Sequence, residues 1–222
     1  MSPTTENEFT DSDRGRLRDT LWRGACLTLV FLLCGCLSRP YLKVQTYAFE
    51  PLTGSAPKPA VANRRVVAIR SLRVATPFES RSFVYRTGKF SYETDPYAEF
   101  LVSPSESLLF PIRAWMRETG AFETFVEAGG SHQPNTIAEI TVLELYGDFR
   151  QPTEAAAEMK VRFVLFAASK GIAAELMLDR EYSRRIPLKA RSAEALMAGW
   201  NEALAQILGQ FDSDLRMLES AS

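Results

Sequence analysis

The chain has 222 residues, of which 46% are hydrophobic and 24% charged, and its formal net charge is -1 at pH 7. This length suffices for one domain with a sizeable core, and the composition is ordinary for a globular protein. Basic and acidic residues are mixed along the chain, which argues against the strongly basic surface typical of nucleic-acid-binding proteins, so we expect no nucleic-acid partner.

The three cysteines, Cys26, Cys34 and Cys36, lie close together near the N-terminus. No cysteine follows Cys36, so the rest of the chain can form no internal disulfide and offers no thiol nucleophile. The stretch between these cysteines is mostly apolar and lacks histidine, whereas a zinc site normally requires four ligands on a polar frame. We therefore expect neither a metal nor another cofactor.

The first 35 residues have the layout of an export signal. Residues 1–13 are polar and acidic, and we expect them to be disordered. Four arginines follow within residues 14–23, and then an apolar stretch covers residues 25–33. A basic region, an apolar region and small residues at a cleavage point occur in this order in secretory signal peptides. The apolar stretch is short for a membrane-spanning helix, which requires roughly 20 residues.

The four residues Leu33, Cys34, Gly35 and Cys36 resemble the bacterial lipobox, in which a leucine and two small residues precede a cysteine. We predict that a signal peptidase recognises Leu33, Cys34 and Gly35 and that the Cys36 thiol takes a diacylglycerol. Cleavage before Cys36 would free its amine for a further acyl chain. Two or three chains give the stable anchoring that a single chain does not. The alternative is an uncleaved, short inner-membrane anchor.

The residue after Cys36 is Leu37 rather than aspartate, which resembles the outer-membrane address of lipoproteins in many Gram-negative bacteria. We expect a lipid-anchored protein of the outer membrane that faces the periplasm, with the inner membrane as the alternative. The predicted organisation is a disordered N-terminus and signal peptide over 1–35, a lipidated tether over 36–40 and a single periplasmic α+β domain over 41–218.

The predicted domain begins with two strands, over 41–50 and 66–74, joined by a loop over 51–63 that contains three prolines. Seven aromatic residues follow between Phe78 and Phe100, and a β-hairpin turning near Gly88 accounts for their arrangement. Two interpretations stay open for them: a core with cross-strand pairs, or a surface that faces a lipid or a protein. The candidate contact residues are Phe83, Tyr85, Arg86, Phe90, Tyr92, Tyr97 and Phe100.

Two helices are predicted in the rest of the domain. The first begins after Ser103, where Pro104 and Glu106 complete a capping signal, and it ends near Gly120. We expect Pro111 to kink this helix or to delay its regular start. The second helix covers about 192–215 and carries an apolar stripe at helical spacing.

Four strands are predicted between the two helices, over 122–126, 136–149, 159–165 and 176–183. The alternation of apolar residues changes phase after Val142, which predicts a β-bulge. A run of strands between two helices favours an α+β fold, with a mainly antiparallel sheet and both helices packed on one face.

The sequence contains no evident catalytic constellation. His132 is the only histidine and lies in a loop of small residues, so neither a Ser-His-Asp triad nor a metal triad can be argued. Asp179 and Glu181 alternate along a strand, where solvated positions are commoner than glycosidase acids. We therefore expect a binding or assembly protein rather than an enzyme. An exported hydrolase that uses Asp179, Glu181 or His132 is the catalytic alternative.

Several short motifs occur together in the body: Phe83-Val84-Tyr85-Arg86-Thr87-Gly88, then Tyr92-Glu93, Tyr97 and Glu99-Phe100, and a helix through Trp115 that exits at Thr119-Gly120-Ala121-Phe122. With these motifs, residues 40–215 resemble the ABC-type transport auxiliary lipoproteins, the family that contains paraquat-inducible protein C.

This resemblance implies a role beside a transporter that moves lipids between membranes. The transporter would consist of an inner-membrane ATPase and permease and a periplasmic protein of the mammalian-cell-entry type. The chain would be a non-catalytic docking or assembly component, with segment 78–100 and helix 103–119 as its contact surface; whether it forms a homo-oligomer is left open. The alternative is a structural or assembly lipoprotein of another envelope machine, not linked to lipid transport.

Overall fold

The computed structural model describes residues 43–51, 65–127, 132–168 and 175–220. The chain divides into two units, Met1–Lys43 and Val44–Ser222, and the fold described below is that of the second unit. The predicted signal peptide and tether, and with them Leu33, Cys34, Gly35 and Cys36, lie outside the described residues. None of the described helices is long and apolar enough to cross a membrane.

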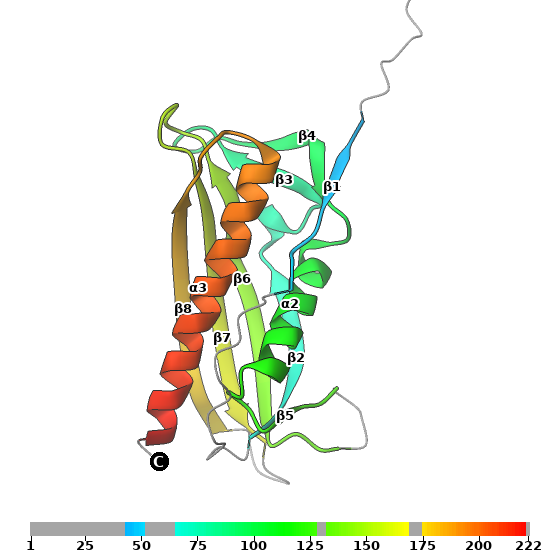
Figure 1. Cartoon of the computed structure of the whole chain (residues 1–222), viewed down its shortest axis with the longest axis vertical. Helices are drawn as coiled ribbons and strands as arrows, with labels where there is room; N and C mark the ends of the chain where they lie inside the picture. The colour runs from blue at the N-terminus through cyan, green and yellow to red at the C-terminus, as the bar shows by residue number, and fades with distance from the viewer. Residues whose placement is uncertain (1–42, 52–64, 128–131, 169–174, 221–222) are drawn as a thin grey trace, which may run out of the picture. The chain divides into compact units, whose positions relative to one another are not determined.

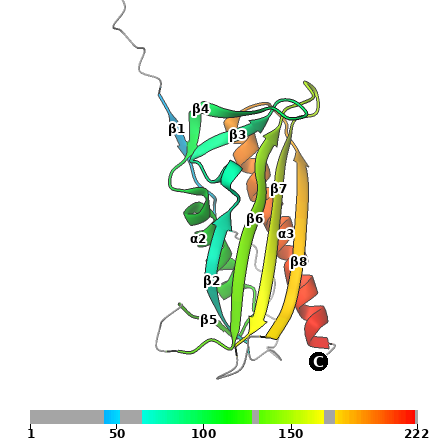
Figure 2. The same cartoon turned by 180° about the vertical axis from the view of Figure 1, so that it is seen from behind.

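The described residues form one eight-stranded sheet and two α-helices, in agreement with the predicted α+β class. The elements in chain order are β1 Gln45–Tyr47, β2 Val66–Val74, the short 3-10 helix η1 Thr76–Phe78, β3 Ser82–Arg86, β4 Tyr92–Phe100, α2 Pro104–Glu118, β5 Thr124–Phe125, β6 Thr136–Asp148, β7 Ala156–Ala167, β8 Glu175–Pro187 and α3 Ala193–Ser220. Both α-helices lie on one face of the sheet (Figure 1), and the view from behind shows the other face, on which no described α-helix lies (Figure 2).

Strand β6 organises the sheet because strands pair along both of its edges. Along one edge β7 pairs antiparallel with β6 over its whole length, and β8 pairs antiparallel with β7. The other edge is shared by two strands, since β2 runs parallel to the first half of β6 and β3 runs parallel to its end. β4 and β1 extend the sheet beyond β3, and β5 pairs with β2. The sheet is therefore mixed, with its longest pairings antiparallel.

The bulge predicted in the long strand is confirmed. The register between β6 and β7 shifts between Val142 and Glu144. Ile140 and Val142 are buried before the shift, and Leu145 is buried after it. Because one extra residue moves the alternation by one position, β6 keeps apolar side chains in the core on both sides of the bulge.

Helix α2 begins as the sequence predicts. The Ser103 side chain accepts a hydrogen bond from the backbone N–H of Glu106, whose carboxylate accepts one from the backbone N–H of Ser103. The helix is continuous from Pro104 to Glu118, so Pro111 does not delay its start. Gly120 follows the last turn with φ of 68°, a conformation that glycine adopts without strain.

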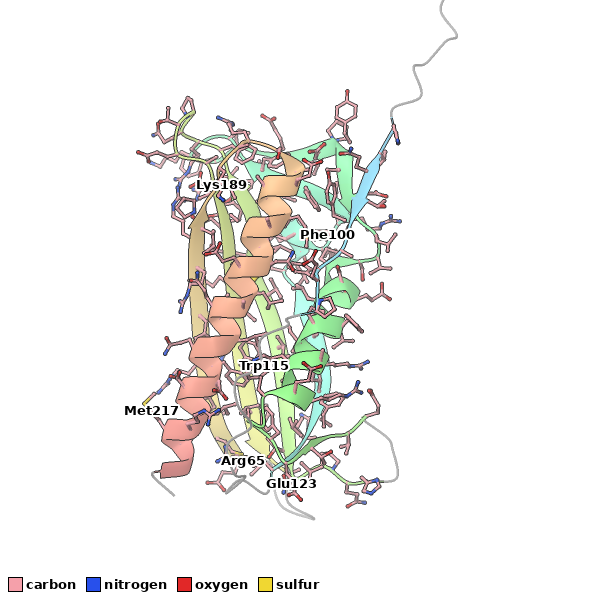
Figure 3. All side chains as sticks on the ribbon, viewed as in Figure 1. Arg65, Phe100, Trp115, Glu123, Lys189 and Met217 are labelled. Atoms are coloured by element: carbon pink, nitrogen blue, oxygen red, sulfur yellow. The ribbon has the colours of Figure 1, made fainter. Side chains whose placement is uncertain are left out.

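The hydrophobic core lies between the sheet and the helices, where α3 packs against β7 and β8 and α2 packs against β2 and β5. The predicted apolar stripe of α3 is confirmed, since all of its members are buried: Leu196, Trp200, Ala203, Leu204, Ile207, Phe211 and Leu215. The Trp115 ring of α2 meets the Phe211 ring of α3 at a centroid distance of 5.8 Å, which joins the two helices (Figure 3).

An aromatic cluster centred on Trp200 connects α3 with β3 and β4. The Trp200 ring meets Phe83 edge-on at a centroid distance of 4.9 Å and stacks on Phe100 at 5.5 Å. Its indole N–H donates a hydrogen bond of 3.2 Å to the carbonyl of Glu158, so the polar atom of this buried side chain has a partner. The cluster therefore fixes the hairpin of β3 and β4 against the last helix.

The Phe83→Ala substitution should lower the free energy of unfolding by about 3–5 kcal/mol, because it opens a cavity among packed rings. Phe90→Ala is the matched control, since Phe90 is 84% exposed, and it should change stability by no more than about 0.5 kcal/mol. Urea unfolding followed by tryptophan fluorescence measures both. Equal losses for the two variants would contradict this placement of the aromatic residues.

Candidate functional site

The candidate contact residues of the aromatic segment divide between the core and the surface. Phe83 and Phe100 are buried, and they pack against the rings of Tyr47 and Phe49 as well as against Trp200. This corrects the expectation that they contact a partner or a lipid, because alternation along β3 and β4 turns their side chains toward α3. The core interpretation holds for these two residues.

Tyr85 and Arg86 are half-buried and stabilise the hairpin next to its turn. The Tyr85 ring stacks on Phe149 at a centroid distance of 4.7 Å, and its hydroxyl donates a hydrogen bond to Asp95. Burial, and then the Asp95 carboxylate, raise the pKa of Tyr85, so this hydroxyl remains a donor at neutral pH. The Arg86 guanidinium lies 5.7 Å from the centre of the Tyr92 ring and donates to the carbonyl of Lys89 at 2.9 Å.

The turn between β3 and β4 carries the most exposed aromatic side chain of the segment. The backbone N–H groups of Thr87 and Gly88 both donate to the carbonyl of Ser91, at 3.0 and 3.3 Å, which confirms the hairpin predicted near Gly88. Phe90 lies in this turn, outside the paired strands, and the Lys89 ammonium is 5.1 Å from its ring centre. Of the candidate contact residues, Phe90, Tyr92 and Tyr97 have large exposed fractions, at 84%, 47% and 51%.

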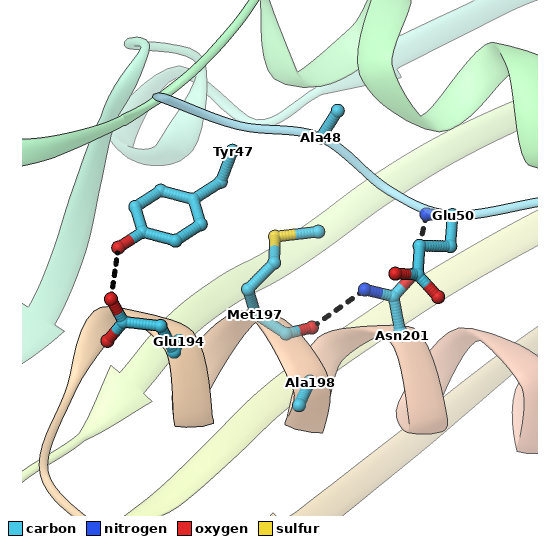
Figure 4. Close-up of a pocket in the computed structure, with 7 residues that line it drawn as sticks. All are labelled: Tyr47, Ala48, Glu50, Glu194, Met197, Ala198 and Asn201. Carbon is cyan, nitrogen blue, oxygen red and sulfur yellow. Dashed lines mark hydrogen bonds between the residues drawn. The ribbon is translucent and has the colours of Figure 1, made fainter. Parts of the chain in front are cut away.

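A surface pocket of about 430 Å³ lies between the β1 segment and α3 (Figure 4). The Tyr47 hydroxyl donates to the Glu194 carboxylate at 2.9 Å, and burial together with that carboxylate raises the pKa of Tyr47 to about 12. The Asn201 side chain accepts from the backbone N–H of Glu50 and donates to the carbonyl of Met197, both at 3.0 Å. These hydrogen bonds hold the β1 segment against α3. The pocket therefore lies where the first strand of the body packs on its last helix.

The carboxylates considered for hydrolysis are held in ion pairs between β7 and β8. Asp179 accepts from the Arg162 Nε at 2.7 Å, and Glu181 lies 2.6 Å from the Lys160 ammonium. The Arg162 guanidinium lowers the pKa of Asp179, which makes this carboxyl a poor general acid at neutral pH. His132 lies on a separate segment, the loop before β6. Within the described ranges no three His, Cys, Asp or Glu side chains are grouped as a metal site.

A buried carboxylate at the end of β6 joins the strands next to the hairpin. The Asp148 side chain is 3% exposed and lies 2.7 Å from Arg150 and 2.6 Å from Arg185. Hydrogen bonds from these two guanidinium groups hold the pKa of Asp148 well below its usual range. Arg185 also pairs with Glu158 of β7, and Asp148 itself stands opposite Arg86 in the register of β3 and β6. The ion pairs therefore link β6, β7 and β8 beside the end of β3.

This fold occurs in other solved structures. A crystal structure of a Xanthomonas campestris protein of the family DUF330 matches with a TM-score of 0.65 at 15% identity, covering 80% of this chain and 100% of that one. The crystal structure of an uncharacterized protein matches with a TM-score of 0.59 at 12% identity, covering 78% and 99%. No family model matches the sequence, and no curated protein does. At these identities the likeness is one of fold.

The Asp148→Asn substitution should lower the free energy of unfolding at pH 7 by about 1–3 kcal/mol, because it removes charge-assisted bonds to two arginines. The folded-state pKa of Asp148 is depressed, so its stabilisation is present above the unfolded value of about 3.9 and is lost as the pH falls through the folded value. The wild-type protein should therefore lose more stability than the variant when the pH is lowered from about 5 to 2.

Denaturant titrations at several pH values measure this difference. Asp179→Asn is the matched control, because its ion pair with Arg162 lies at the surface and should be worth about 0–1 kcal/mol. If the two asparagine variants followed the same pH profile, the role assigned to Asp148 would be wrong.

Proposed function

We propose that this protein is a membrane-anchored auxiliary lipoprotein of an ABC-type, mammalian-cell-entry-linked system that moves lipids between membranes. It acts as a docking or assembly component at the outer membrane and not as an enzyme. The observation that carries the proposal is a folded α+β body whose first strand begins nine residues after the lipobox cysteine, at Gln45. A short tether of this kind keeps a water-exposed domain close to a bilayer.

The assignment to lipid transport is supported by the motifs of the body. The segments that resemble the ABC-type auxiliary lipoproteins form the hairpin of β3 and β4, helix α2 and the exit at Gly120. The fold also matches a DUF330 protein along that protein's whole length. An assembly role is consistent with Asp179 and Glu181 being engaged in ion pairs.

The partner of the proposed function can be tested by affinity purification of the full-length lipidated chain from its own envelope. Retention of a periplasmic mammalian-cell-entry protein with its permease and ATPase would support the proposal. A structural lipoprotein of another envelope machine would instead retain secretion or cell-wall components, and its gene neighbours would be of those classes. A hydrolase would lose an activity on Asp179→Asn or Glu181→Gln.

Replacing Cys36 by serine should abolish incorporation of radioactive palmitate and release the protein from the membrane fraction, because the acylated sulfur would be absent. Cys34→Ser is the matched control, since a small residue at that place suits the lipobox, and it should leave labelling unchanged. Metabolic labelling and membrane fractionation provide the two measurements. A Cys36→Ser protein that is still processed at the same bond and stays membrane-bound would overturn the proposed anchor.

A further inference from the structure

We propose that the turn between β3 and β4 contacts the same bilayer that holds the lipid anchor, with Lys89 and Phe90 entering its headgroup region. This inference rests on the proposed lipidation of Cys36. It deepens that function by naming the surface of the body that faces the membrane and the chemistry of its partner, a phospholipid surface.

The length of the tether limits where the bilayer can lie. Val44, the first residue of the second unit, lies eight positions after Cys36, and even a fully extended chain of this length spans only about 28 Å. Both cartoon views show β1 starting at the end of the sheet that also carries the β3–β4 turn (Figures 1 and 2). A membrane held through Cys36 is therefore within reach of this end of the body.

The side chains of the turn suit a membrane interface. Phe90 is 84% exposed, so its ring contributes nothing to the core, and the Lys89 ammonium lies beside it. A phenylalanine ring gains stability at the boundary between headgroups and acyl chains, while a lysine keeps its ammonium near the phosphates. Tyr97 and Val44, which are 51% and 45% exposed, lie at the start of the β1–β4 pairing. Tyrosine is also favoured at membrane interfaces.

Charges of both signs occur at this end, where Glu93 accepts a hydrogen bond from Thr87 beside the turn and Glu154 is exposed between β6 and β7. Asp148 is neutralised by Arg150 and Arg185, and Arg185 also pairs with Glu158. Lys189, exposed after β8, adds a cation at the same end (Figure 3). The open face of the sheet is similar in this respect, since its charges are also matched by cross-strand ion pairs such as Arg162 with Asp179. The feature that distinguishes the tip is the exposed Phe90 ring with the Lys89 ammonium beside it.

The turn holds Phe90 in a defined position before any contact is made. Two backbone hydrogen bonds to Ser91, the bond from Arg86 to the carbonyl of Lys89 and the bond from Thr87 to Glu93 close the loop on itself. A preorganised turn loses little conformational entropy when it enters an interface. This favours direct contact by the tip over a loop that must first become ordered.

Tryptophan fluorescence can locate the tip in the full-length lipidated protein. The Phe90→Trp variant is reconstituted into vesicles of phosphatidylethanolamine and phosphatidylglycerol, some with brominated acyl chains that quench tryptophan on contact. The matched control is Phe110→Trp, because Phe110 is 61% exposed on α2, away from the turn. The native Trp115 and Trp200 are buried and set the background, which the wild-type protein measures.

We expect bromolipids to lower the added fluorescence of Phe90→Trp by twofold or more and to leave that of Phe110→Trp unchanged. A second substitution, Lys89→Glu, should reduce the quenching of Phe90→Trp, because it places a carboxylate against lipid phosphates. Equal quenching of both tryptophan variants, or no quenching of Phe90→Trp, would overturn the inference. The absence of quenching of Phe90→Trp is also expected if the turn binds a protein instead of a membrane.

Vesicle flotation distinguishes the failure of this inference from the failure of the proposed function. If the protein floats with the vesicles and Phe90→Trp stays unquenched, the anchor stands and the membrane-facing turn is wrong. If the correctly processed protein does not float at all, the lipid anchor is wrong and the inference fails with it.

Discussion

The packing of Trp200 against Phe83 and Phe100 joins parts of the chain that are 100 or more residues apart in sequence. These three rings close the core between the last helix and the hairpin of β3 and β4, and the indole N–H is bonded to the backbone of β7. Since burial of large aromatic rings dominates the stability of a small core, the position of the hairpin depends on this contact. The β1 segment then packs on the same cluster through Tyr47 and Phe49.

The same aromatic segment serves both the core and the surface, because strand side chains alternate. Ala98 and Phe100 of β4 point inward. Tyr97, which precedes Ala98 in the strand, points outward. The exposed Tyr97 ring therefore lies beside the start of β1. The buried rings of this segment hold its exposed rings in place. The packed cluster therefore supports an exposed surface without being part of it.

Local sequence signals predicted the structure correctly where it depends on short-range interactions. The capping box at Ser103, the helix end near Gly120 and the bulge after Val142 were all predicted correctly, because each depends on residues within one turn or one strand. The apolar stripe of α3 was equally clear. The hydrogen bond between Tyr47 and Glu194 could not be predicted, since no local pattern indicates a contact between residues 147 positions apart.

The sequence by itself determined the α+β class, the two helices and most strands, since periodicity and capping are local properties of the chain. The lipobox-like segment Leu33–Cys36 is likewise a linear pattern; it stays a prediction from the sequence, because it lies outside the described residues. Only the tertiary structure decided that β2 and β3 share one edge of β6, and that Phe83 and Phe100 are core while Phe90 is surface. Strand pairing and burial depend on contacts between distant segments, and an aromatic residue has the same identity in a core as at a surface.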